Sequence, residues 1–96
     1  MAKRLSASEV QTRLAQLEGW GLSNEEIART FIVKDFPAAL MLVNAVGQLA
    51  ESAGHHPDIT IKYNRVTFAL VTHDAGGLTD KDLDLAAQIN ALPVLT

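Results

Sequence analysis

One stretch of the chain has apolar residues at every second position, and this stretch restricts the possible folds most. From Asp58 onward the alternation runs through Ile59, Ile61, Tyr63, Val66, Phe68 and Leu70. Period-two alternation is typical of strands that bury only one face. With Asn64 and Arg65 as the central turn residues, the stretch predicts an antiparallel hairpin that needs a second layer over its apolar face.

Helical signals precede this hairpin at two places. Ser6 and Glu9 have the spacing of a capping box, and the apolar residues that follow predict a helix over about residues 6–17. Asp35 can cap a second helix that has a proline in its first turn. Gly54 is suited to end this second helix, because glycine adopts the left-handed conformation common at helix C-termini.

A further helix follows the hairpin, and another hairpin precedes the second helix. Thr79 and Asp82 repeat the capping-box spacing at the start of a third helix. Between residues 19 and 34, β-branched and aromatic residues predict two strands with a turn near Ser23 and Asn24.

The expected order is therefore helix, strand, strand, helix, strand, strand, helix. Connections this short favour antiparallel pairing and helices on one side of the sheet. We predict a two-layer α+β fold, a four-stranded antiparallel sheet with three helices on one face, formed by residues 1–96 as a single domain. The open edges of such a sheet favour association of copies, as a homodimer or homotetramer.

Composition excludes several classes of function. A formal net charge of −3 provides no excess of basic residues to neutralise phosphates, so we expect no direct nucleic-acid partner. The chain has no cysteine, its first residues lack a secretory signal, and its longest apolar run is too short to span a membrane. The cytoplasm is the expected location.

The three histidines of the chain lie within nineteen residues, at His55, His56 and His73. Extending the predicted hairpin register places His56 opposite His73, with His73 on the face away from the helices. Glu51, four residues before His55, offers a carboxylate near the imidazoles, and such a neighbour favours the protonated ring and fixes its orientation.

This cluster suits two kinds of chemistry, and each residue also has a structural interpretation. Imidazoles can move protons without a metal, or three of them can bind a zinc ion, although adjacent histidines do not readily converge on one ion. Alternatively, the histidines belong to a polar loop, Glu51 is solvated, Pro57 begins a strand, and Asp82 is the third residue of a helix that Thr79 caps, where acids are favoured regardless of chemistry.

Taken together, the spaced residues resemble the signature of the pterin-4a-carbinolamine dehydratases. The pattern is Glu51, three residues, His55-His56-Pro57, five residues, Tyr63, nine residues, His73, eight residues and Asp82. The resemblance continues through the flanking segments EIARTFIVKDFPAALMLVNAVGQLAE and LTDKDLDLAAQIN, so it covers nearly the whole chain. No motif position departs from the family pattern.

The resemblance implies dehydration of 4a-hydroxytetrahydropterin to quinonoid dihydropterin, which regenerates the cofactor of aromatic amino acid hydroxylases. Under this hypothesis His55 and His73 are the acid-base pair and His56 binds and orients the pterin. Substrate-binding or orienting roles fall to Glu51, Pro57 and Asp82. The reaction needs neither a metal nor a redox cofactor.

Two other hypotheses remain. Animal relatives in this family also act as dimerisation partners of a homeodomain transcription factor, so the fold can serve as a protein-binding module. A hydrolase with a three-histidine metal site is the third possibility. The sequence leaves open which histidine is the acid, which pterin side chain is accepted, and whether the oligomer is a dimer or a tetramer.

Overall fold

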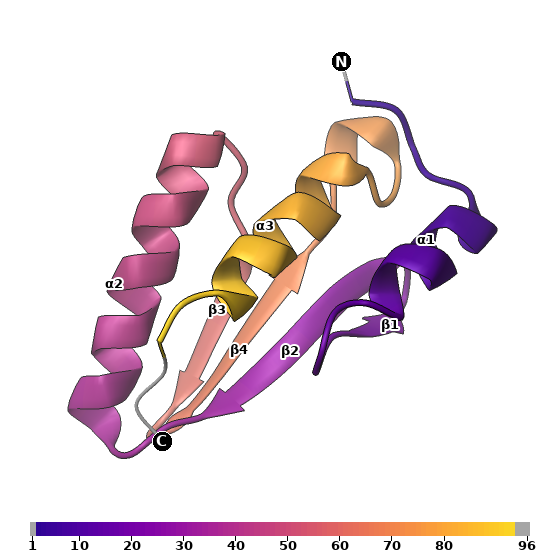
Figure 1. The fold of residues 1–96 in the computed structure, drawn as a ribbon. Helices are drawn as coiled ribbons and strands as arrows, with labels where there is room; N and C mark the ends of the chain where they lie inside the picture. The colour runs from indigo at the N-terminus through magenta and orange to yellow at the C-terminus, as the bar shows by residue number, and fades with distance from the viewer. Residues whose placement is uncertain (1, 94–96) are drawn as a thin grey trace.

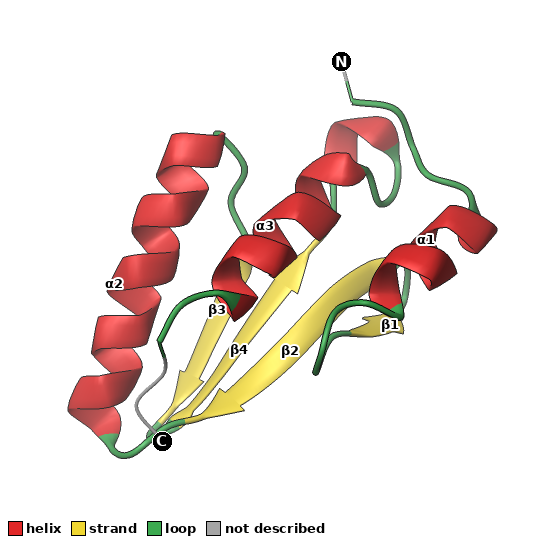
Figure 2. Cartoon of the chain, in the orientation of Figure 1, coloured by secondary structure: helices red, strands yellow, loops and turns green. Residues whose placement is uncertain are grey.

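The structure, a computed structural model, describes residues 2–93. Its elements follow in the order α1 (Ala7–Leu14), β1 (Gly21–Ser23), β2 (Glu26–Ile32), α2 (Phe36–Ala53), β3 (Asp58–Lys62), β4 (Arg65–Leu70), the short 3-10 helix η1 (His73–Ala75) and α3 (Asp80–Asn90). Figure 1 shows their arrangement in space, and Figure 2 separates the helices from the strands.

The predicted two-layer α+β fold is confirmed. The four strands form one sheet in the order β1-β2-β4-β3, and every neighbouring pair is antiparallel. All three α-helices lie on one side of this sheet (Figures 1 and 2). β1 and β3 are therefore the edge strands, and no helix within residues 2–93 covers the other face of the sheet. None of the helices within residues 2–93 is both long and apolar enough to cross a bilayer.

The helices begin where the local capping signals predict. Ser6 and Glu9 form a reciprocal capping box, and the backbone N–H and hydroxyl of Ser6 hold the pKa of Glu9 below its usual value. The Asp35 side chain accepts a hydrogen bond from the Ala38 N–H at the start of α2. Gly54 ends α2 with a φ of 64°, a conformation that glycine adopts without steric cost.

Helix α1 ends at Leu14, three residues earlier than predicted. Beyond it the chain is held on a non-helical path, because the Glu18 carbonyl accepts hydrogen bonds from Arg29 (2.9 Å) and Asn90 (3.0 Å). The Asn90 side-chain oxygen also accepts from the Trp20 indole (2.8 Å) and from Arg29 (2.7 Å). These long-range bonds fix the connection from α1 to β1 against the C-terminal end of α3.

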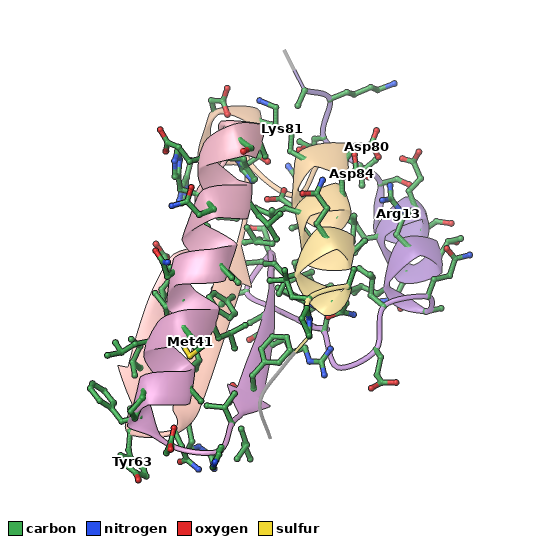
Figure 3. All side chains as sticks on the ribbon, turned by 60° about the vertical axis from the view of Figure 1, so that its left-hand side comes forward. Arg13, Met41, Tyr63, Asp80, Lys81 and Asp84 are labelled. Atoms are coloured by element: carbon green, nitrogen blue, oxygen red, sulfur yellow. The ribbon has the colours of Figure 1, made fainter. Side chains whose placement is uncertain are left out.

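Figure 3 shows a second link between α1 and α3, made by Arg13. Its guanidinium lies 2.9 Å from Asp80 and 2.9 Å from Asp84. Ion pairs at an exposed surface contribute little stability, so the core must supply most of it.

The core lies between the helical layer and the covered face of the sheet. Phe68 at the centre of β4 is fully buried and meets the Phe31 ring edge-on, with 5.9 Å between centroids. The other fully buried large apolar side chains come from β2, α2, β4 and α3: Ile27, Val46, Val66, Leu70, Leu83, Leu85 and Ile89. Removing this apolar surface from water is the main driving force for the fold.

The predicted register of the β3–β4 hairpin was wrong by two residues. Lys62 pairs with Arg65, so Tyr63 and Asn64 are the central turn residues, rather than Asn64 and Arg65. The turn is fixed from outside the hairpin: the Asn64 carbonyl accepts from the Val33 N–H (2.9 Å), and the Asn64 side-chain amide donates to the Val33 carbonyl (3.1 Å). A shift of two residues keeps every side chain on its predicted face, so the apolar face was correct although the cross-strand partners were not.

Candidate active site

His55 follows the helix-ending glycine of α2 and turns its ring toward α3. Its backbone N–H still bonds to the Ala50 carbonyl (3.1 Å), which fixes where the side chain starts. The ring is 12 % exposed, and its Nε2 lies 2.5 Å from Oδ1 of Asp82. A residue on the α2–β3 connection is therefore bound directly to the first turn of α3.

The Asp82 carboxylate is fully buried and has three donors around it. Oδ1 faces His55, and Oδ2 accepts from the Thr72 hydroxyl (2.8 Å) and the Thr79 backbone N–H (2.9 Å). Because an ionised carboxylate only accepts, the His55 proton in this pair belongs on Nε2. Nδ1 of His55 is then the ring nitrogen left for other chemistry.

Thr72 and Thr79 complete this buried network. The Thr72 hydroxyl has one proton, which it donates to Asp82, so it accepts from the Thr79 hydroxyl 2.8 Å away. Thr79 also caps α3 by accepting from the Lys81 N–H (3.2 Å). Asp82 is thus both the predicted capping-box partner of Thr79 and the partner of His55. Thr72 was not singled out from the sequence; its signal is a polar residue two positions after a buried strand.

His56 pairs with the other carboxylate of the signature. Its Nε2 lies 2.8 Å from Oε1 of Glu51, and both side chains are largely exposed, at 63 % and 79 %. Glu51 therefore contacts the second histidine of the pair and not His55. Pro57 follows, half-buried, directly before β3.

The predicted placement of His73 opposite His56 was wrong. β4 ends at Leu70, and reciprocal backbone bonds between Thr72 and Gly77 (3.1 and 3.3 Å) close a tight loop that contains η1. His73 begins η1 and its side chain is exposed. It is joined to the buried network through its neighbour Thr72, and no hydrogen bond links its ring to His55 or His56 within residues 2–93.

A hollow of about 280 Å³ lies beside His73. Its other lining residues are Asn24, Glu25, Glu26, Val71, Gly76 and Gly77. The sequence did not indicate the β1–β2 turn as part of the site, because only the pairing of β2 with β4 brings it there.

Tyr63 lies apart from the other signature residues. It occupies the β3–β4 turn, whereas the histidines lie beyond the opposite ends of these strands. Its ring stacks on Phe36 with 6.5 Å between centroids, and the residue is 65 % exposed (Figure 3). Tyr63 therefore lies at the end of the hairpin that is far from the histidines.

The described residues do not bring metal ligands together. Across residues 2–93, no three His, Cys, Asp or Glu side chains are arranged as a metal-binding group. His55 and His56 instead each pair with a different carboxylate.

The comparison with protein families gives a match over nearly all of the described residues. Residues 3–92 match the family model described as pterin 4 alpha carbinolamine dehydratase. The chain belongs to this family. Relatives provisionally named pterin-4-alpha-carbinolamine dehydratases include one from Chloroflexus aurantiacus, 58 % identical over 93 % of this chain and 96 % of the relative. Another, from Thermosynechococcus vestitus, is 47 % identical over 99 % of this chain and 100 % of the relative.

Solved structures agree with this assignment. The crystal structure of a transcriptional coactivator/pterin dehydratase from Brucella melitensis has a TM-score of 0.89 at 37 % identity, and covers 93 % of this chain and 97 % of that one. A pterin dehydratase-like protein described as a RuBisCO assembly factor of the alpha-carboxysome has a TM-score of 0.63 at 19 % identity, over 80 % of this chain and 89 % of that one. The second likeness shows the fold alone. Family and relatives together support pterin carbinolamine dehydratase activity.

Proposed function

We propose that this chain is a lyase that dehydrates 4a-hydroxytetrahydropterin to quinonoid dihydropterin by histidine acid-base catalysis without a metal. The observation that carries the proposal is the His55 imidazole held 2.5 Å from a fully buried carboxylate in a pterin dehydratase fold. An ordered imidazole with one free ring nitrogen is suited to proton transfer near neutral pH.

The reaction requires two proton movements. The C4a–O bond breaks as an acid protonates the departing hydroxyl, which leaves as water. A base removes the proton from N5, and its electron pair forms the new C4a=N5 double bond. The substrate thus becomes the product and one water molecule, and the reaction needs no oxidant or reductant. Two imidazoles in opposite protonation states can perform both transfers.

The residue roles follow from where each ring is held. His55 and His73 are assigned as the acid-base pair, since one is ordered by Asp82 and the other lines an open hollow. His56, with Glu51 beside it, is assigned to binding and orienting the pterin, and Pro57 shapes the start of β3 next to it. In this proposal the enzyme works in the cytoplasm and serves an aromatic amino acid hydroxylase, the class of enzyme that would supply its substrate.

Dehydration by the wild-type chain in chelator-treated buffer is the direct test. We expect acceleration over the spontaneous reaction, followed by pterin absorbance, and the same rate after prolonged dialysis against EDTA. Histidine catalysis of this kind typically contributes about 10² to 10⁴ in rate per group. A folded chain that gives no acceleration would contradict the proposal, and activity restored only by zinc would favour the metal hydrolase.

A protein-binding role is the second candidate, and the outer surface of α2 favours it. Phe36, Leu40 and Met41 are 43 %, 47 % and 62 % exposed, and Figure 3 shows Met41 pointing away from the sheet. Ile59 on edge strand β3 is 38 % exposed. Apolar side chains gathered on one surface are typical of interaction sites. The Brucella structure is likewise described as a coactivator as well as a dehydratase.

We propose that copies of this chain associate through the α2 surface and the β3 edge. Met41→Glu places a charge where an apolar contact would form, so it is expected to lower the molar mass measured by analytical ultracentrifugation. Gln11→Glu is the matched control, because it adds one charge at an exposed position of α1. An unchanged mass for Met41→Glu would exclude α2 from the interface.

A further inference from the structure

The hollow beside His73 contains a carboxylate to which the proposed chemistry assigns no role. Glu26, the first residue of β2, lines this hollow and is half-buried. Its neighbour Glu25 forms an ion pair with Arg4, with 2.8 Å between Oε1 of Glu25 and Nη2 of Arg4. Within residues 2–93, by contrast, the Glu26 side chain has no hydrogen bond or ion pair, so its carboxylate is available to a ligand.

The size and lining of the hollow suit a small ligand. Val71 supplies an apolar lining, and Gly76 and Gly77 present backbone without side chains. A side chain at Gly77 would meet Arg4, since an added Cβ would lie 2.7 Å from its Nε. The volume of about 280 Å³ is near the lower end of small-molecule sites, which span roughly 300 to 1,000 Å³. One small ring system therefore fits better than an extended ligand.

Contacts made by Arg4 and Leu5 hold the β1–β2 turn, which directly precedes Glu26. Arg4 packs against Gly77 and pairs with Glu25, so it connects the turn to the loop that follows η1. The next residue, Leu5, donates its backbone N–H to the Leu78 carbonyl (2.8 Å). These contacts thus connect the side of the hollow that contains Glu26 to the side that contains His73.

We propose that Glu26 is a substrate-binding residue that recognises the pyrimidine edge of the pterin, an assignment that rests on the proposed dehydratase function. This edge carries two adjacent N–H donors, the 2-amino group and N3–H. A carboxylate accepts two parallel donors, as it does from arginine, and charge-assisted bonds of this kind are about twice as strong as neutral ones. C4a and N5 lie elsewhere on the same small bicycle, so His73 can face the reacting atoms while Glu26 holds the far edge.

Steady-state kinetics of Glu26→Gln test this assignment. The amide retains one acceptor oxygen but loses the charge, and its NH₂ faces a substrate donor. We expect KM to rise about tenfold and kcat to stay within about twofold, the pattern of a contact made equally in ground and transition states. Glu18→Gln makes the same chemical change on an exposed side chain outside the hollow and should leave both constants unchanged. Thermal unfolding of Glu26→Gln should match wild type, because no intramolecular contact is lost.

A binding measurement separates this inference from the catalytic one. Calorimetry with pterin and with 4-oxopteridine, which lacks the 2-amino group, should show that wild type prefers pterin and that Glu26→Gln loses most of this preference. An unchanged preference and KM in Glu26→Gln would overturn the role of Glu26 even if the enzyme is active. Failure of the wild-type chain to accelerate dehydration would instead overturn the proposed function. The binding preference for pterin over 4-oxopteridine would still test whether Glu26 recognises the 2-amino group.

Discussion

Replacing His73 with alanine is expected to lower the enzyme-catalysed dehydration rate at least about 10²-fold in metal-free buffer, because the variant lacks one member of the proposed acid-base pair. The side chain is exposed and begins a short 3-10 helix outside the sheet, so its removal leaves the core intact. Loss in kcat with little change in KM would indicate an interaction made in the transition state. The measurement is single-substrate kinetics by pterin absorbance, with a thermal melt of each variant.

Asp74→Ala is the matched control for His73→Ala. Asp74 is the next residue of η1 and is also exposed, so this substitution perturbs the same turn without removing an imidazole. Its rate should stay within about threefold of wild type, far from the change expected for a proton-transfer group. A His73→Ala variant that keeps more than half of the wild-type rate would remove His73 from the catalytic pair and leave His55 to act with solvent.

Asp82→Asn is expected to lower both stability and activity. The wild-type carboxylate takes three donors in a fully buried site, whereas asparagine offers one acceptor oxygen and presents NH₂ to a donor. Leaving buried hydrogen-bonding groups unpaired costs about 1 to 3 kcal/mol each, so we expect a loss of about 2 to 4 kcal/mol in unfolding free energy. The rate should fall with it, because the His55 ring loses the carboxylate that fixes its orientation.

Urea unfolding and dehydration rates of the same preparations measure both effects. Asp84→Asn is the control on the same helix: it loses only an exposed pair with Arg13, so it should cost less than about 1 kcal/mol. A double-mutant cycle between Asp82→Asn and His55→Ala isolates the coupling of the two side chains. Wild-type stability in Asp82→Asn, or additive effects in the cycle, would show that the pair is energetically unimportant.

Features that depend on neighbours in sequence were predicted well. Ser6, Asp35 and Thr79 cap their helices as expected, because a cap and its partner are only a few residues apart. Alternation of apolar residues likewise identified the covered face of the β3–β4 hairpin. Alternation fixes the face but not the offset, and the offset depends on Asn64 bonding to Val33, 31 residues away.

The sequence indicated candidate site residues but not the contacts that they make. Asp82 and His55 are 27 residues apart, and nothing local indicates that this acid, rather than Glu51, is the partner of His55. The position of His73 depends on the backbone bridge between Thr72 and Gly77, which ends the strand early. Glu26 could not be found from the motif, because strand pairing alone places it beside His73.

Asp82 both stabilises the start of α3 and holds the His55 ring, and these two roles restrict how proteins descended from this one can change. A descendant that abandoned the chemistry for a purely binding role could lose the exposed imidazole of His73 at small cost to folding. It could not as readily lose the acid at position 82, since Thr79, Thr72 and the start of α3 depend on that carboxylate. In such a lineage, an aspartate that persists after its histidines have gone would be evidence of selection on folding and not of retained catalysis.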